Sequence, residues 1–133
     1  MSKYVTTETD IFSVFALETW TDEDIPTHPA NYTANDHDTE FIRISIIPGS
    51  SGINSNSVEG ILMIDIFTSA GYGDRRSLVI ADILDQFLVK KTFSSSGRTT
   101  QIFESTLVSS NDNEDETLNR KIYTIPFKHF GVN

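Results

Sequence analysis

Few side chains in this sequence could carry out chemistry, and they are scattered. There is no cysteine, which excludes thiolate nucleophiles, disulfide bonds and cysteine-based zinc sites. The GxSxG, HExxH and P-loop patterns are absent, and GYGD at 71–74 is too short for a phosphate-binding fingerprint. Pairs of acidic residues carry no specific signal in a chain with 19 Asp and Glu. We therefore predict a protein that is not an enzyme, with no catalytic residue and no cofactor.

Two histidines lie in a polar segment where a metal site could be considered. His28 and His37 belong to the stretch 21–38, and His37 stands between Asp36 and Asp38. Adjacent side chains in an irregular loop point in different directions, and no second pair of ligands has a fixed helical or hairpin spacing. We interpret the stretch as a solvated connection without a metal. A buried pocket with convergent polar groups near these histidines would instead favour a small-ligand-binding or hydrolytic domain.

Charged residues at defined positions are better candidates for a functional role. Arg43 lies within an apolar strand, where a guanidinium usually pairs with a carboxylate, and Asp65 on the next strand is the expected partner. A contact with another subunit or a substrate is the alternative. Arg75 and Arg76 begin a helix behind Asp74, whose side chain can accept from the first free amides. The two arginines could hold an anion there or reach a carboxylate on an adjacent subunit.

These residues depend on a central unit between residues 60 and 88. The apolar run ILMIDIF at 61–67 predicts a buried strand, because it is almost unbroken and largely β-branched. Gly71 and Gly73 indicate a turn. Apolar residues then recur at three- and four-residue spacing between 80 and 88, which predicts an amphipathic helix packed on the sheet.

The remaining elements complete the expected fold of this 133-residue chain, which we take as one domain. A capping box of Thr7 and Asp10 is expected to begin a helix that ends near Trp20, after a loose arm. The connection 21–38 allows at most a short edge strand, near Tyr32, and strands are expected at 40–47, 99–109 and 120–130. Pro48 should end the first of them, and Pro126 should place the last at a sheet edge or a bulge. This order predicts an α+β domain: one mostly antiparallel sheet of four to five strands, with two helices packed on one face.

The charge and the apolar content limit the possible partners. The formal net charge is −9, which disfavours a surface that binds nucleic-acid phosphates. No apolar run approaches the roughly 20 residues needed to cross a bilayer, and the amino terminus lacks the apolar core of a secretory signal. We expect a soluble intracellular product without a membrane partner.

The layout resembles the tail terminator (tail completion) proteins of long-tailed bacteriophages, over approximately residues 11–88. The features that carry the resemblance are spread along the chain: a helix ending in Trp20, Ile25-Pro26 leading to Asn31, a strand at Phe41-Ile42-Arg43, Val58-Glu59-Gly60 before ILMIDIF, GYG at 71–73, and a helix with Ile80-Ala81-Asp82.

The resemblance implies a structural virion protein. It would form a ring, typically a hexamer, at the head-proximal end of the tail tube, stop tube polymerisation and present a docking face to the head. The expected partners are further copies, the tail tube protein and a head connector or head-completion protein. DNA would pass through the lumen without specific binding, and negative charge would keep it from adhering. A head-closure or connector adaptor is the nearest alternative.

The residues expected at contacts follow from this hypothesis. The expected interface residues are Arg43, Arg75, Arg76, Asp74 and Asp65. The expected lumen or docking residues lie in the polar loops 49–57 and 111–117, and are Ser50, Asn54, Asp112, Glu114, Asp115 and Glu116.

Overall fold

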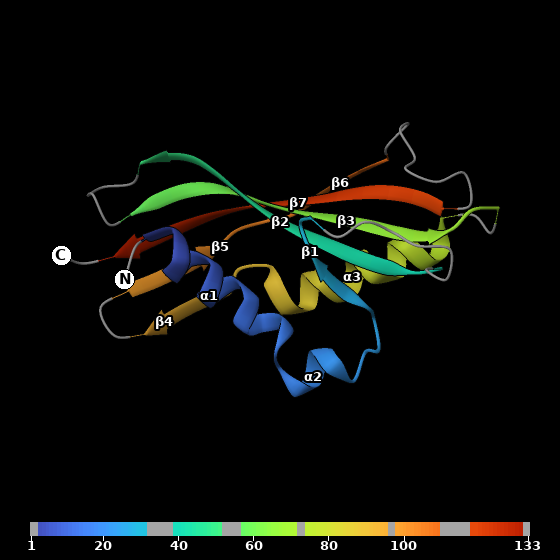
Figure 1. The fold of residues 1–133 in the computed structure, drawn as a ribbon, viewed down its shortest axis with the longest axis horizontal. Coiled ribbons are helices and arrows are strands. Elements are labelled where there is room, and N and C mark those ends of the chain that lie inside the picture. Colours follow the sequence, from blue (N-terminus) through green and yellow to red (C-terminus); the bar gives the residue numbers. More distant parts are fainter. Residues whose placement is uncertain are drawn as a thin grey trace.

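The computed structural model describes residues 3–31, 39–51, 57–71, 74–95, 98–109 and 118–131. Within these ranges the protein is mostly β, with seven strands in one curled mixed sheet and three helices (Figure 1). The helices are α1 (Lys3–Phe15), α2 (Glu18–Thr21) and α3 (Arg75–Leu88). The strands are β1 (Thr27–Pro29), β2 (Phe41–Ser51), β3 (Val58–Ser69), β4 (Thr92–Ser95), β5 (Arg98–Ile102), β6 (Thr106–Ser109) and β7 (Leu118–Gly131).

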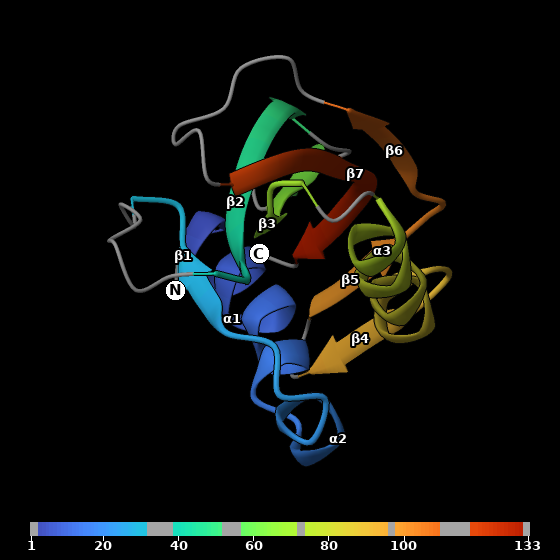
Figure 2. The ribbon, with the colours of Figure 1, turned by 90° about the vertical axis from the view of Figure 1, so that its right-hand side faces the viewer.

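The strand order is β1-β2-β3-β7-β5-β4, and β6 also pairs with β7. β1 runs parallel to β2, whereas the other described pairings are antiparallel. The sheet arches over α1 when viewed end-on (Figure 2), so we call the face toward the helices concave and the other face convex. The expected α+β domain of four to five strands and two helices is therefore wrong. β1 lies in the connection where the sequence allows a short edge strand. The strand expected at 99–109 is interrupted at 103–105 and forms β5 and β6. The prediction lacked β4, whose four residues are too few to show an alternating pattern.

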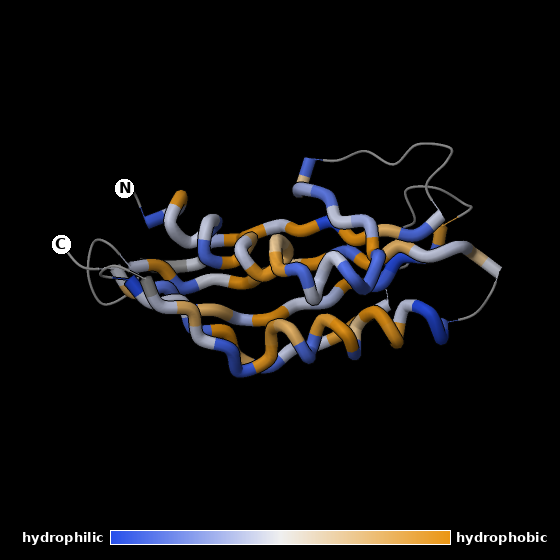
Figure 3. Tube along the Cα trace, turned by 90° about the horizontal axis from the view of Figure 1, so that it is seen from below, coloured by the Kyte–Doolittle hydropathy of each residue, from blue (hydrophilic) through white to orange (hydrophobic). Residues whose placement is uncertain are grey.

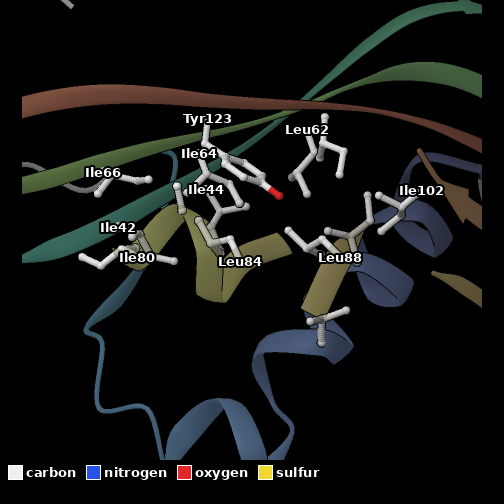
Figure 4. Close-up of a cluster of buried hydrophobic side chains, with 14 of the residues drawn as sticks. Ile42, Ile44, Leu62, Ile64, Ile66, Ile80, Leu84, Leu88, Ile102 and Tyr123 are labelled. Carbon is white, nitrogen blue, oxygen red and sulfur yellow. The ribbon is translucent and has the colours of Figure 1, made fainter. Parts of the chain in front are cut away.

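The main core lies between the concave face and the helices. Strand residues alternate between the two faces, and the apolar set of β2, β3 and β7 belongs to the core with residues of α1 and α3. Apolar and polar residues alternate along these strands (Figure 3). From α3, Ile80, Leu84 and Leu88 pack beneath Ile64 and its neighbours (Figure 4). Their spacing is that of the predicted amphipathic helix, and α3 ends at the predicted residue, Leu88.

The amino-terminal helix differs from its prediction. α1 begins at Lys3 and ends at Phe15, and a separate turn of helix, α2, carries Trp20. Thr7 is not an N-cap, because its hydroxyl donates to the Lys3 carbonyl at 2.6 Å within the helix. Asp10 is not part of a capping box either, since it is buried against the sheet.

Two prolines lie within strands without ending them. β2 continues past Pro48 through a register irregularity to Ser51. Opposite Pro48 stands Gly60, where a Cβ would collide with the carbonyl oxygen of Ile47. β7 is not a sheet edge, since it pairs on both sides. The strands that pair with its other side, β5 and β6, are interrupted beside Pro126, which has no N–H to donate there, whereas the pairing with β3 continues through Pro126 in register, so neither the predicted edge position nor a bulge in β7 is found.

Candidate interface on the convex face

The convex face is built from side chains in register across β2, β3 and β7. Arg43 lies opposite Asp65, and Asp65 lies opposite Ile122. Four residues farther along β2, Ile47 lies opposite Ile61, which in turn lies opposite Pro126. The first group is nearly buried, whereas Ile47, Ile61 and Pro126 are exposed. The two ends of this face therefore have different chemistry.

At the buried end, one carboxylate holds two guanidinium groups. Arg43 donates from Nη2 to Asp65 Oδ2 at 3.1 Å, and Arg120 donates from Nη2 to Asp65 Oδ1 at 2.8 Å. Both arginines also donate from Nε to the same oxygens. The side chains of Arg43 and Arg120 are only 11% and 18% exposed, and that of Asp65 is 2% exposed. The predicted pairing of Arg43 with Asp65 is confirmed, and Arg120 is a second partner that the sequence did not indicate.

Aromatic side chains support this charge cluster. The guanidinium carbons of Arg43 and Arg120 lie 5.1 and 5.9 Å from the centre of the Phe67 ring. Phe67 stacks on Phe41 at 4.6 Å, and both form a second small core with Leu118. The cluster therefore stabilises this end of the sheet from within one chain, and any contact it makes with another molecule is additional.

At the other end, exposed apolar side chains form a continuous row. Ile47 is 46% exposed and Ile61 is 44% exposed. Pro126 continues the row, and its carbonyl accepts from the amide of Phe103, which is 38% exposed. We call Ile47, Ile61, Pro126 and Phe103 the apolar row. Single exposed apolar residues are common, but a row across adjacent strands marks a surface suited to a partner.

The charged residues at the start of α3 differ in their contacts. Arg76 forms a two-pronged pair with Glu40, from Nε at 2.6 Å and from Nη2 at 2.9 Å, and this hydrogen bonding raises the pKa of Arg76. Arg75 is exposed and has no ion pair in the described part of the chain. Asp74 precedes the helix as predicted, but its side chain does not cap it. Instead, its Oδ1 accepts from Asn119 Nδ2 at 3.3 Å.

A second buried carboxylate, Asp10 of α1, joins that helix to the sheet. Its Oδ1 accepts from Arg98 Nε at 3.0 Å, and its Oδ2 accepts from the Thr100 hydroxyl at 2.8 Å. Thr100 also lies 2.7 Å from Nδ1 of the buried His129, and the Thr6 hydroxyl lies 3.0 Å from Nε2. Sequence reasoning missed this network because its members are far apart in the chain, and no spacing connects them.

The hydrogen bonds and the burial of His129 act on its imidazole ring. Thr100 gives its one hydroxyl proton to Asp10, so Nδ1 of His129 must be the donor to Thr100. Nε2 of His129 lies 3.0 Å from the Thr6 hydroxyl, which donates to the Lys3 carbonyl at 3.1 Å. Burial lowers the pKa of His129, and this outweighs the opposing effect of the Asp10 charge. The arrangement orients α1 against β5 and β7.

Several sequence-based site predictions fall outside the described residues. These are Asn54, Asp112, Glu114, Asp115, Glu116 and His37. Ser50 lies in β2, where its backbone is in register with Glu59. The predicted lumen and docking loops therefore stay predictions.

The described ranges show no group of three His, Cys, Asp or Glu side chains that could hold a metal. His28 lies in β1 with its ring against the edge of Phe41, at 5.7 Å. A cleft of about 280 Å³ lies beside β1, and its walls include Trp20, Asp24 and Pro26 but not His28. Because His28 does not line this cleft and His37 lies outside the described residues, the alternative of a ligand site near the histidines stays a prediction. Among the described helices, none combines the length and apolarity needed to cross a membrane.

Comparisons with known proteins add information on the fold. No family model and no curated protein matches the sequence. Solved structures are similar to the chain, and one of them, of a protein without a descriptive name, matches over 96% of this chain and 95% of its own. The TM-score is 0.66 and the sequence identity is 11%. The chain is therefore similar in fold to that protein along nearly its whole length.

Proposed function

We propose that this chain is a structural subunit that works by assembling with copies of itself into a ring, as a tail terminator does at the head-proximal end of a phage tail tube. The observation that carries the proposal is the apolar row on the convex face. Ile47 and Ile61 are about half exposed on adjacent strands, and burying apolar area contributes roughly 25 cal/mol per Å². A second protein surface is the natural means of covering this row.

The location in a phage tail has separate support. It comes from the sequence resemblance, which spans the first helix, β2, β3 and α3. The net charge of −9 suits a subunit that surrounds a DNA conduit, because like charge prevents the duplex from binding the wall. On this proposal the partners are further copies, the tail tube protein and a head connector, and the protein performs no catalysis.

Mass measurement tests the proposal directly. The full chain is studied by light scattering at several concentrations, alone and with the tail tube protein. We expect a closed oligomer of defined mass, visible as a ring by negative-stain electron microscopy, and capping of tube ends that limits tube length. A protein that stays monomeric under all these conditions and leaves tube length unchanged would contradict the proposal.

Arg75 supplies a narrower test of the predicted contacts. It is exposed and unpaired in the described part of the chain, so Arg75→Glu should leave the unfolding free energy almost unchanged. If Arg75 contacts the tube or a neighbouring copy, the variant assembles less. Lys91→Glu is the matched control, because Lys91 is also exposed and forms no ion pair with any residue that the structure describes. Equal assembly of both variants would remove Arg75 from the interface.

A further inference from the structure

A second surface of the protein complements the apolar row in shape. A cleft of about 160 Å³ lies between α1 and the sheet. Ile46, Pro48, Val58 and Phe127 form its apolar wall, and Tyr4, Thr7 and Glu8 line it from α1. A cavity of about 150 Å³ accommodates a benzene ring in a protein interior, so the cleft has the volume for one aromatic side chain.

The apolar row ends in a side chain that suits this cleft. Phe103 is 38% exposed, and the ammonium group of Lys128 lies 5.8 Å from the centre of its ring. Phe103 therefore presents an aromatic ring beside the ammonium group of Lys128, which also lies 3.7 Å from a carboxylate oxygen of Glu59. The cleft presents an apolar wall beside the exposed carboxylate of Glu8. The two features complement each other in charge as well as in size.

The wider surfaces have the same complementarity. The described residues of the convex face carry three basic side chains, Arg43, Arg120 and Lys128, against the two acidic side chains of Asp65 and Glu59. The outer side of α1, α2 and the following turn carries exposed acidic residues, and Lys3 is the single basic residue between 3 and 31. These exposed acids are Glu8, Glu18, Asp22, Glu23 and Asp24.

We propose that Phe103 and Lys128 of one copy bind the cleft of the next copy, with Phe103 against the apolar wall and Lys128 facing Glu8. The inference rests on the proposed function and identifies the interface that builds the ring. The two surfaces are different patches of one chain, so the contact is heterologous. Contacts of this kind repeat from copy to copy and close into a ring when the rotation permits.

Charge favours the head-to-tail contact over the two symmetric alternatives. In a contact of convex face with convex face, the basic side chains are already paired within their own chain, Arg43 and Arg120 with Asp65 and Lys128 with Glu59, and the acidic helical surface gains no basic partner. The helical surface against itself would set Glu8 and Glu18 against like charges, with no basic residue but Lys3 to offset them. Like-charge contacts oppose association, whereas the head-to-tail contact pairs opposite charges.

Two variants that each block one surface test the proposal. Phe103→Asp removes the aromatic ring, and Tyr4→Asp places a charge at the mouth of the cleft, where Tyr4 is 55% exposed. We expect each variant alone to be monomeric. Mixed together, they should form a dimer and nothing larger, because one intact pair of surfaces remains. Leu78→Asp is the control: Leu78 is an equally exposed apolar residue of α3 outside both surfaces, and its variant should assemble normally.

The other outcomes overturn the proposal in distinguishable ways. Circular dichroism and thermal unfolding first establish that the variants are folded. If the wild-type chain is monomeric with and without the tube protein, the proposed function fails. If the wild type forms a ring but the mixed variants stay monomeric, or either variant alone still assembles, only this interface is wrong. Loss of assembly in Leu78→Asp would show that the effect is not specific to the two surfaces.

Discussion

Two buried aspartates, Asp65 and Asp10, each bind guanidinium groups in this protein, and their structural roles differ. Asp65 accepts from Arg43 and Arg120 on strands that already pair with its own. Asp10 accepts from Arg98, which is 88 residues away, and so attaches α1 to a strand with which it shares no backbone pairing. The first cluster is a feature of a surface, whereas the second determines where a helix lies. Substitutions of Asp65 and Asp10 should therefore differ in how much stability they remove and in which part of the protein they affect.

The largest effect is expected at Asp65. Asp65→Asn keeps the shape of the side chain but leaves two nearly buried guanidinium groups without a counter-charge. Breaking a buried pair by removing one partner costs about 3–5 kcal/mol of unfolding free energy. Denaturant unfolding measures the loss, and Asp82→Asn, at an exposed position of α3, is the control. A loss below about 1 kcal/mol would show that both arginines reach water when the carboxylate is neutral.

A smaller and more local effect is expected at Asp10. Asp10→Asn removes the charge that faces Arg98, but this arginine is 21% exposed and can turn toward solvent. We expect a loss of about 1–3 kcal/mol, the range for a charge-assisted hydrogen bond. Amide hydrogen exchange should show reduced protection in α1 and little change in β3. Thr9→Ala, at an exposed position of the same helix outside the cleft, should leave exchange unaltered. Equal loss of protection in both elements would contradict the local role of Asp10.

The contrast between the two clusters also explains what the sequence could reveal. The pairing of Arg43 with Asp65 was predictable because two long apolar strands lie close in sequence, and a charge within each needs a partner. The extent of α3 was predictable from the spacing of Ile80, Leu84 and Leu88. Both inferences use local periodicity, which the fold then preserves.

Other features depended on contacts that no local pattern records. Thr7 and Asp10 have the spacing of a capping box, yet Thr7 bonds within the helix and Asp10 binds β5. A hydroxyl or carboxylate can accept or donate hydrogen bonds equally well at the start of a helix and inside the fold. Tertiary contacts therefore decide which of the two positions it takes. The position of Pro126 inside the sheet required a break between β5 and β6 that only the folded chain shows.

Acidification should act on the Asp10 cluster through His129. Its pKa lies below the ordinary value of 6.5 in the folded protein, so below about pH 6.5 the unfolded chain binds a proton that the folded protein does not. This contribution to stability is therefore complete above pH 6.5 and decreases as the pH falls toward the folded pKa. Unfolding measured between about pH 7 and pH 5.5 should show the decrease. His129→Gln should flatten it, whereas His28→Gln should not. An unchanged slope in His129→Gln would assign the pH dependence to other groups.

The smallest effect is expected at Arg76, although its pair with Glu40 has the shortest contact of the arginines discussed, 2.6 Å. The Arg76 side chain is 46% exposed, so water replaces Glu40 at little cost when the pair is broken. Arg76→Gln should lower the unfolding free energy by about 0–1 kcal/mol, and added salt should reduce the difference further. A loss comparable to that of Asp65→Asn would mean that distance, and not burial, sets the strength of ion pairs in this protein. Arg43, Arg76 and Arg120 all donate from both Nε and Nη2, and they differ mainly in their access to water. Comparing Asp65→Asn with Arg76→Gln therefore separates the effect of hydrogen-bond geometry on stability from the effect of desolvation.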